Sequence, residues 1–255
     1  TCSTSAQFET YQLLKAGADV SMYDTNIWAF ADDSISFFGK VVLKVELEPV
    51  DEYTHITTVE EFKTLIAANP AGKFKLDADL DFANTFITGA DATVLAADFT
   101  GELDGQGHQI LNAKLPGGWA GHGIFTNNKG TIKNIAFINL IGSKVTTNVG
   151  IVSNNKGIIE NLYVDYVVQS GTHGDYNGTI ASLADNGSEI RNCIVNVRFA
   201  EGATLPPNQG SIIGKAGGWS GYVRNCYAIV NGTGITGVNF NEAASGVAAF
   251  TCSAS

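Results

Sequence analysis

The sequence has few basic residues, few cysteines and no long apolar run. It carries 15 Lys and Arg against 25 Asp and Glu, which gives a net charge of −10. A protein that binds a phosphate backbone needs the opposite balance, so we expect no nucleic-acid partner. No apolar stretch reaches the roughly 18 residues that span a bilayer, so we expect no membrane insertion. Four cysteines in 255 residues are too few for a disulfide scaffold.

A segment of 15 residues occurs twice in the chain. Residues 123–137 (GIFTNNKGTIKNIAF) and 150–164 (GIVSNNKGIIENLYV) are identical at eight positions and begin 27 residues apart. A fixed interval of this size indicates a repeat architecture. Short runs of branched residues, separated by Gly and Asn turns and without helical periodicity, indicate successive strands. The sequence therefore predicts a β-solenoid.

The core of the unit, an apolar residue two positions before an Asn, occurs five times. Stacked windings would place these apolar residues in one buried ladder, about 4.8 Å apart: Ile110, Ile132, Ile159, Ile190 and Val223. The asparagines would lie at a corner with left-handed backbone, and their amides would bond to the asparagines above and below: Asn112, Asn134, Asn161, Asn192 and Asn225. We expect these asparagines to be structural.

The repeats resemble the GLUG-type repeats of secreted and surface bacterial proteins. These belong to the right-handed parallel β-helix group, together with pectate lyases, phage tailspikes and filamentous adhesins. The resemblance covers roughly residues 54–250 and includes the segments 56–62 (ITTVEEF) and 99–110 (FTGELDGQGHQI). The usual opening Gly-Leu-Phe-Gly is here Gly-Ile-Phe-Thr, at 123–126. The resemblance implies an all-β parallel β-helix and an extracellular, cell-surface or virion-surface location.

Three parts are expected along the chain. Residues 1–53 are β-rich, with strand-like segments at 19–23, 27–30, 34–38 and 41–47, and have the pattern of part of an immunoglobulin-like domain. Residues 54–72 contain a helix with a capping box at 58–61 (TVEE), which we expect to cover the first rung. Residues 73–255 are expected to form about six rungs.

The two ends of the sequence suggest a piece of a longer or processed protein. The chain starts at Thr1 without Met, and residues 246–251 have the pattern of a strand that opens another rung. We therefore expect the solenoid to be truncated at its C-terminus, with an exposed end through which copies of the chain can associate.

No catalytic, metal or cofactor site can be assigned from the sequence. One alternative stays open, a calcium ion held by three carboxylates on one outer strand face: Asp77, Asp79 and Asp81. A similar acidic group follows: Asp98, Glu102 and Asp104. Arg191 and Arg224 stack on adjacent rungs, but no acid pair matches both, as a lyase would require, and Glu189 is the nearest acid.

Two cysteines occupy the same position in adjacent rungs. Cys193 and Cys226 should have Cα atoms about 5 Å apart, within the range that a disulfide accepts. Because stacked Cβ atoms usually diverge, we favour two buried thiols that act as small apolar side chains.

Aromatic residues on glycine-rich loops are the best candidates for ligand binding. The segments 117–119 and 217–219 both read Gly-Gly-Trp, and further aromatic side chains follow each of them. The candidate residues are Trp119, His122, His173, Tyr176, Trp219 and Tyr222. Aromatic loop residues suit sugar rings or a protein partner, and the acidic chain favours neutral glycans over polyanionic ones. The alternative is that each Trp packs over its own loop.

The function that these features favour is a non-catalytic extracellular β-helix, an adhesin-like module that displays loops for a glycan or a surface protein. Two alternatives remain. One is a glycan depolymerase, either a polysaccharide lyase or a hydrolase, and the other is a structural fibre or decoration module of a virion.

Overall fold

The computed structural model describes residues 28–31, 40–43, 51–118, 122–143, 145–146, 150–173, 177–185, 187–203, 209–216, 222–231, 238–243 and 247–252. The chain divides into two compact units, Thr1–Glu52 and Tyr53–Ser255. In the first unit, β1 (Trp28–Ala31) pairs antiparallel with β2 (Lys40–Leu43). These strands match two of the four expected there; the segments 19–23 and 34–38 lie outside the described residues. The immunoglobulin-like assignment stays a prediction.

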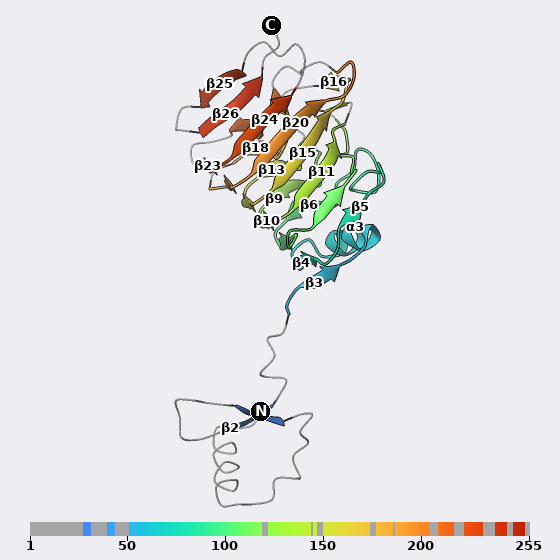
Figure 1. Cartoon of the computed structure of the whole chain (residues 1–255), viewed down its shortest axis with the longest axis vertical. Helices are drawn as coiled ribbons and strands as arrows, with labels where there is room; N and C mark the ends of the chain where they lie inside the picture. The colour runs from blue at the N-terminus through green and yellow to red at the C-terminus, as the bar shows by residue number, and fades with distance from the viewer. Residues whose placement is uncertain are drawn as a thin grey trace, which may run out of the picture. The chain divides into compact units, whose positions relative to one another are not determined.

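The second unit winds through three parallel sheets (Figure 1). The first sheet contains β3 (Thr54–Ile56), β4 (Lys73–Leu76), β7 (Glu102–Asp104), β10 (Thr131–Lys133), β14 (Ile158–Glu160), β19 (Glu189–Arg191) and β23 (Tyr222–Arg224). The second contains β5 (Leu80–Asp81), β8 (Gln109–Leu111), β11 (Ala136–Ile141), β15 (Tyr163–Val168), β20 (Ile194–Phe199) and β24 (Tyr227–Asn231). The third contains β6 (Ala96–Phe99), β9 (Phe125–Asn128), β13 (Val152–Asn155), β18 (Ala181–Ala184) and β22 (Ile213–Ala216).

Each winding passes through the first, second and third sheet in turn. Five windings place a strand in every sheet, and β23 and β24 begin a sixth. Connections between parallel strands of one sheet are right-handed in nearly all proteins. The fold is a right-handed parallel β-helix, as the sequence predicts.

The buried ladder of the first sheet follows the expected register with one exception. Ile132 lies opposite Ile159, which lies opposite Ile190, and all three side chains are buried. Below Ile132 the ladder continues with Leu103, so the prediction for Ile110 is wrong. Ile110 lies in the second sheet. The reason is a close glycine stack: a Cβ on Gly130 would collide with the backbone of Gly101, which fixes β7 beneath β10.

The asparagine corner has the expected backbone, but one of the five expected asparagines lies outside its column. All five asparagines are left-handed, with φ between 51° and 56°. Four of them form a continuous column in which each side-chain amide donates to the Oδ1 below it: Asn134, Asn161, Asn192 and Asn225. Asn112 does not belong to this column, because Asn134 donates to Asp104 instead. Asn112 lies at the end of β8, between Asp81 and Asn139.

Helix α3 (Val59–Ala68) covers the N-terminal end of the column (Figure 1). Thr58 and Glu61 form the predicted capping box. Phe62 and Ile66 are fully buried, and the Phe62 ring meets that of Phe82, in the first winding, edge to face at 5.8 Å. Strand β3 extends the first sheet beyond β4 at the same end. The predicted cap is confirmed.

The C-terminal strands do not open another rung. Strand β26 (Val247–Cys252) runs antiparallel both to β25 (Val238–Ala243) and to β21 (Gln209–Gly210), which pairs in parallel with β17 (Asn177–Gly178). The expectation for residues 246–251 is therefore wrong, because strand pattern alone does not set strand direction. Self-association at this end stays a prediction.

Cys193 and Cys226 lie in neighbouring windings as free thiols, as expected. Cys193 is buried and Cys226 is half-buried. The hydrogen bond between the two thiols and the burial of Cys193 both raise the pKa of the Cys193 thiol. Cys193 therefore acts as a small core residue.

Candidate functional site

The long loops of the β-helix gather along one side of the column. Connections from the first to the second sheet, and from the third to the first, contain five residues or fewer. Connections from the second to the third sheet contain ten or more: 82–95, 112–124, 142–151, 169–180 and 200–212. They lie on the side where β16 (Thr172–His173) is labelled in Figure 1. Because loops carry function on a rigid scaffold, this side is the first place to look for a site.

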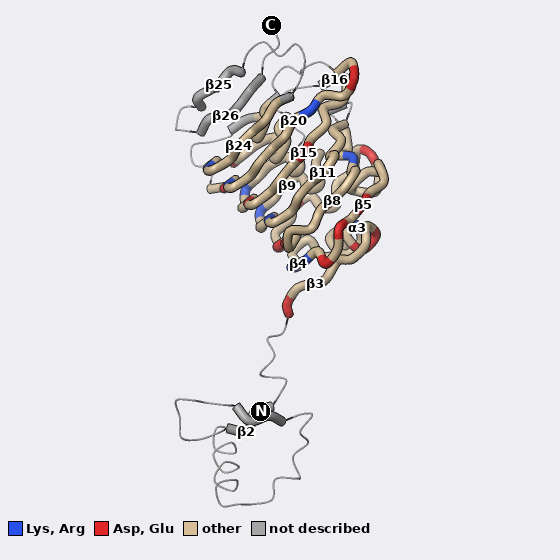
Figure 2. The backbone as a smooth tube through the Cα atoms, in the orientation of Figure 1, with Lys and Arg blue, Asp and Glu red and all other residues tan. Residues whose placement is uncertain are grey.

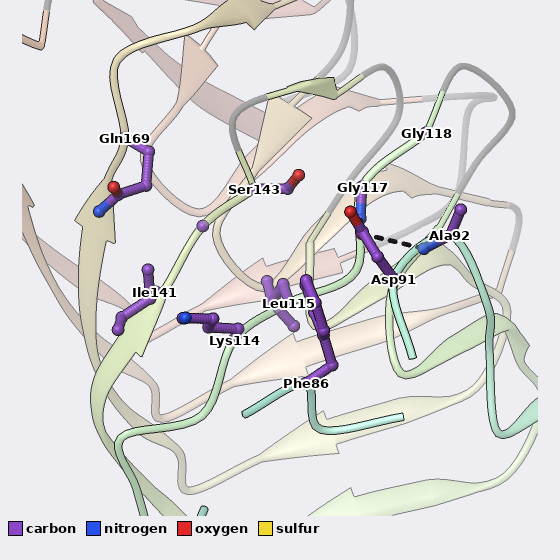
Figure 3. A pocket seen from close by; sticks show the side chains of 11 residues that line it. Phe86, Asp91, Ala92, Lys114, Leu115, Gly117, Gly118, Ile141, Ser143 and Gln169 are labelled. Atoms are coloured by element: carbon purple, nitrogen blue, oxygen red, sulfur yellow. Dashed lines mark hydrogen bonds between the residues drawn. The ribbon is translucent and has the colours of Figure 1, made fainter. Parts of the chain in front are cut away.

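Residues from four successive windings line a pocket of about 560 Å³ on this side (Figure 3). Ligand pockets in proteins commonly have volumes of about 300 to 1,000 Å³. The residues that line it are Phe86, Asp91, Ala92, Lys114, Leu115, Gly117, Gly118, Ile141, Gly142, Ser143 and Gln169. Apolar and polar side chains therefore share one cavity.

The wall of the pocket continues the solenoid register. Lys114 forms parallel bridges with Phe86 in the winding below and with Ile141 in the winding above. The backbone hydrogen bonds on both sides of Lys114 measure 2.9 Å, from Lys114 N–H to Thr85 O and from Ile87 N–H to Lys114 O. The side chains of Phe86, Lys114 and Ile141 follow one another along the wall of the pocket in Figure 3. Because their backbones are bridged, the column holds these residues in place.

The two charged residues of the pocket differ in their surroundings. Oδ1 of Asp91 accepts hydrogen bonds from the N–H groups of Gly117, at 2.6 Å, and Ala92, at 2.9 Å. The bond from Gly117 joins the first two long loops. Lys114 is half-buried and, among the described residues, no carboxylate pairs with its ammonium group. The described part of the pocket thus combines a fixed carboxylate with a cation that has no carboxylate partner there.

His122 is the predicted ligand residue that the structure places next to this pocket. Its ring lies where a Cβ on residue 118 would be, so only a glycine fits at Gly118, which lines the pocket. Its Nδ1 is buried, and no hydrogen-bond partner for it is found among the described residues. His173 lies in β16, which pairs with β12 (Val145–Thr146) on the same side; its side chain is outside the description.

The two Gly-Gly-Trp segments follow different strands along the chain. Segment 117–119 comes after β8 of the second sheet and before β9 of the third, whereas 217–219, which lies outside the described residues, comes after β22 of the third sheet and before β23 of the first. Tyr222 belongs to β23, where the Arg224 guanidinium lies over its ring at 5.1 Å. The structure therefore does not bring Tyr222 together with His122. Trp119, Tyr176 and Trp219 lie outside the described residues, and their ligand-binding role stays a prediction.

Each of the three candidate calcium ligands bonds to a different group. Asp77 meets His55 at 2.7 Å, and Asp79 meets His108 at 3.1 Å. Asp81 accepts from the side chain of Asn112 at 3.0 Å. Among the residues that the structure describes, no group of three or more His, Cys, Asp or Glu is arranged to hold a metal ion. Calcium at these carboxylates therefore receives no support from their geometry.

The outer face of the first sheet carries paired charges of both signs (Figure 2). The second acidic group, Asp98 with Glu102 and Asp104, is divided between two sheets. Asp98 lies in β6 of the third sheet and pairs with Lys129 at 2.6 Å. Glu102 pairs with Lys133 at 2.6 Å, and Asp104 lies 3.5 Å from the same ammonium. These pairs are structural interactions between windings.

Glu160 is the residue of this face that sequence reasoning missed. It bonds to Arg191 at 2.6 Å, and Glu189 contacts both Arg191, at 3.0 Å, and Arg224, at 2.5 Å. The hydrogen bond that Arg191 donates to Glu160 raises the pKa of Arg191. A guanidinium held protonated in this way is a poor base for a lyase reaction. The sequence signal for Glu160 was its position in the repeat, one residue before Asn161.

A second exposed surface lies on the outer face of the second sheet. Tyr163, Ile194 and Tyr227 occupy one register position in successive windings and are 39%, 44% and 64% exposed. A shallow hollow of about 490 Å³ adjoins Tyr163. Its other lining residues are Gln106, Gly107, Asn134, Ile135, Ala136 and Asn161. We call Tyr163, Ile194 and Tyr227 the outer stripe.

Comparisons with known proteins support the fold. Neither a scan against protein-family models nor a search of curated proteins finds a match. A solved structure from Bacteroides ovatus, described as a putative immunoglobulin A1 protease, superposes with a TM-score of 0.51 at 24% identity and covers 71% of this chain. The chain spans 57% of the length of that protein. At this identity the similarity concerns the fold alone. Within the described part of the chain, no helix is long and apolar enough to cross a membrane.

Proposed function

We propose that this chain is a non-catalytic, extracellular, adhesin-like module that binds a glycan through the long loops of its β-helix. The observation that carries the proposal is the pocket between Phe86 and Gln169. Its wall is partly apolar, with Leu115 buried and Phe86 and Ile141 half-buried. A sugar ring presents an apolar face and a rim of hydroxyl groups, which suits a cavity that has both kinds of lining.

The surroundings of the pocket favour binding over catalysis. A glycoside hydrolase needs two carboxyl groups that face each other across the sugar, roughly 5 to 9.5 Å apart. Among the described residues that line this pocket, Asp91 is the single acidic one, and two backbone N–H groups already bind its Oδ1. Extracellular placement is supported by the resemblance to surface-protein repeats.

A glycan array tests the proposal with a variant that fills the pocket. Ser143 lies at the pocket and is half-buried. Ser143→Trp should abolish binding to whichever array glycan the parent protein retains. Thr131→Trp, on the outer face of β10, is the matched control and should bind as the parent does. Equal binding by the parent and Ser143→Trp would contradict the proposal. Release of oligosaccharides during incubation would instead favour the depolymerase alternative.

A further inference from the structure

Lys114 differs from the other lysines whose side-chain contacts are described. Three of these pair with carboxylates: Lys129, Lys133 and Lys156. Three others lie over aromatic rings: Lys63, Lys73 and Lys75. Within the described part of the chain, Lys114 has neither kind of partner, although Asp91 lines the same pocket. The protein carries ten more acidic than basic groups. A lysine that has no carboxylate partner among the described residues is therefore unexpected in this chain.

Lys114 is half-buried as a residue, and among the described residues no carboxylate balances the charge of its ammonium group. The Lys114 backbone is fixed by two hydrogen bonds, and its side chain lies between the side chains of Phe86 and Ile141 along the wall. A lysine held in this way is a point charge with free N–H donors. Such a group completes its contacts by binding a negatively charged ligand atom.

We infer that the pocket selects a sugar residue bearing one carboxylate, which binds the ammonium group of Lys114. The inference rests on the proposed glycan-binding function and adds its specificity. The sugar ring would lie against the apolar wall of Phe86 and Ile141, and its hydroxyl groups would face the polar part of the pocket. The volume of about 560 Å³ accommodates a single sugar residue with space for its linkage.

The remaining charges limit the ligand to a single acidic sugar. Asp91 lines the same cavity, and a ligand with two negative charges would meet it. At a net charge of −10, the protein repels a polyanion over distances of about 8 to 10 Å in physiological salt. An isolated acidic sugar in a neutral glycan therefore fits better than a uniformly charged polysaccharide. This narrows the expectation of neutral glycans to neutral chains with an acidic unit.

Matched sugar pairs test the inference directly. The probes are methyl glucuronide with methyl glucoside, and methyl galacturonide with methyl galactoside, because each pair differs only in a carboxylate against a hydroxymethyl group. Binding is titrated by NMR on the full chain. At least one uronide should bind about tenfold more tightly than its neutral partner, which is the contribution of about one charge-assisted contact. The 6-sulfate of each hexoside is a third arm that separates carboxylate recognition from general anion binding.

Two lysine variants complete the experiment. Lys114→Gln should remove the preference for the uronide. Lys156→Gln makes the same change in net charge at a surface ion pair with Asp185, so it should keep the preference. Equal binding of uronide and hexoside, an unchanged preference in Lys114→Gln, or stronger binding of the sulfate overturns the inference and leaves the glycan-binding function standing. If neither the sugars nor the array glycans bind, both fail.

Discussion

The side-chain amide of Asn161 donates a hydrogen bond to Oδ1 of Asn134, 2.9 Å away in the winding below. Both residues have left-handed backbone. Asn161→Ala should lower the free energy of unfolding by about 1 to 3 kcal/mol, because it loses the amide contacts and places Ala in a strained conformation. Asn161→Gly keeps the backbone relaxed and should cost less than half as much. Urea denaturation measures both, and equal losses would contradict a role for the backbone.

Removal of the Phe62 ring from helix α3 should lower the stability of the β-helix more than Asn161→Ala does. Phe62 is fully buried and packs edge to face on Phe82. Phe62→Ala should destabilise the β-helix by about 3 to 5 kcal/mol, as other buried Phe truncations do. Glu60→Ala, on the exposed side of α3, is the control and should change stability by less than about 1 kcal/mol. A small effect of Phe62→Ala in thermal unfolding would mean that α3 does not seal the column.

Acid should weaken a contact on the second sheet. The Asp165 carboxylate binds Arg198 at 2.6 and 2.7 Å, and this hydrogen bonding lowers the pKa of Asp165. A lowered pKa in the folded state stabilises the fold at pH values above the ordinary carboxyl pKa of about 3.9. That contribution is lost as the pH falls through the lowered pKa.

Asp165→Asn should therefore cost about 1 to 2 kcal/mol at pH 7, and the cost should shrink below about pH 4. The measurement is urea denaturation at pH values from 7 down to 3. A cost that stays constant over this range would show that the ion pair does not contribute through its charge.

Thiol labelling should distinguish the two stacked cysteines. Cys193 is buried, and its pKa is raised, whereas Cys226 is half-buried. Iodoacetamide should modify Cys226 in the folded protein at least about tenfold faster than Cys193, because the thiolate is the reactive form. Peptide mass spectrometry measures both sites separately. A disulfide-linked peptide containing both residues, isolated without reductant, would contradict the description of free thiols.

The sequence predicts the fold well where the repeats are regular. Identical spacing in 123–137 and 150–164 sets the register of Ile132 and Ile159, and the capping box sets the start of α3. The prediction for Ile110 fails because the winding that contains it has Asp104-Gly105, and not an Asn, at its first corner. The apolar-x-Asn pattern of Ile110 and Asn112 therefore lies in the second sheet. The C-terminal hairpin depends on pairing with β21, far away in sequence, which no local pattern encodes.

The candidate site was harder to predict than the fold. Asp91, Lys114 and Ser143 come from three loops that share no sequence pattern, and only the stacking of windings brings them together. His122 was identified as an aromatic loop residue, and it does adjoin the pocket through Gly118. Glu160 was available from the repeat alignment, because the residues before three successive corner asparagines alternate in charge: Lys133, Glu160 and Arg191.

The position of the bound sugar is the most direct test of the account. Isotope labelling of isoleucine methyl groups allows Ile141, which lines the pocket, to be compared with Ile194, which lies in the outer stripe. On titration with the tightest-binding methyl uronide, we predict that the Ile141 methyl resonance shifts and saturates while that of Ile194 stays in place. A saturating shift at Ile194 with none at Ile141 would contradict the assignment of the pocket as the sugar-binding site.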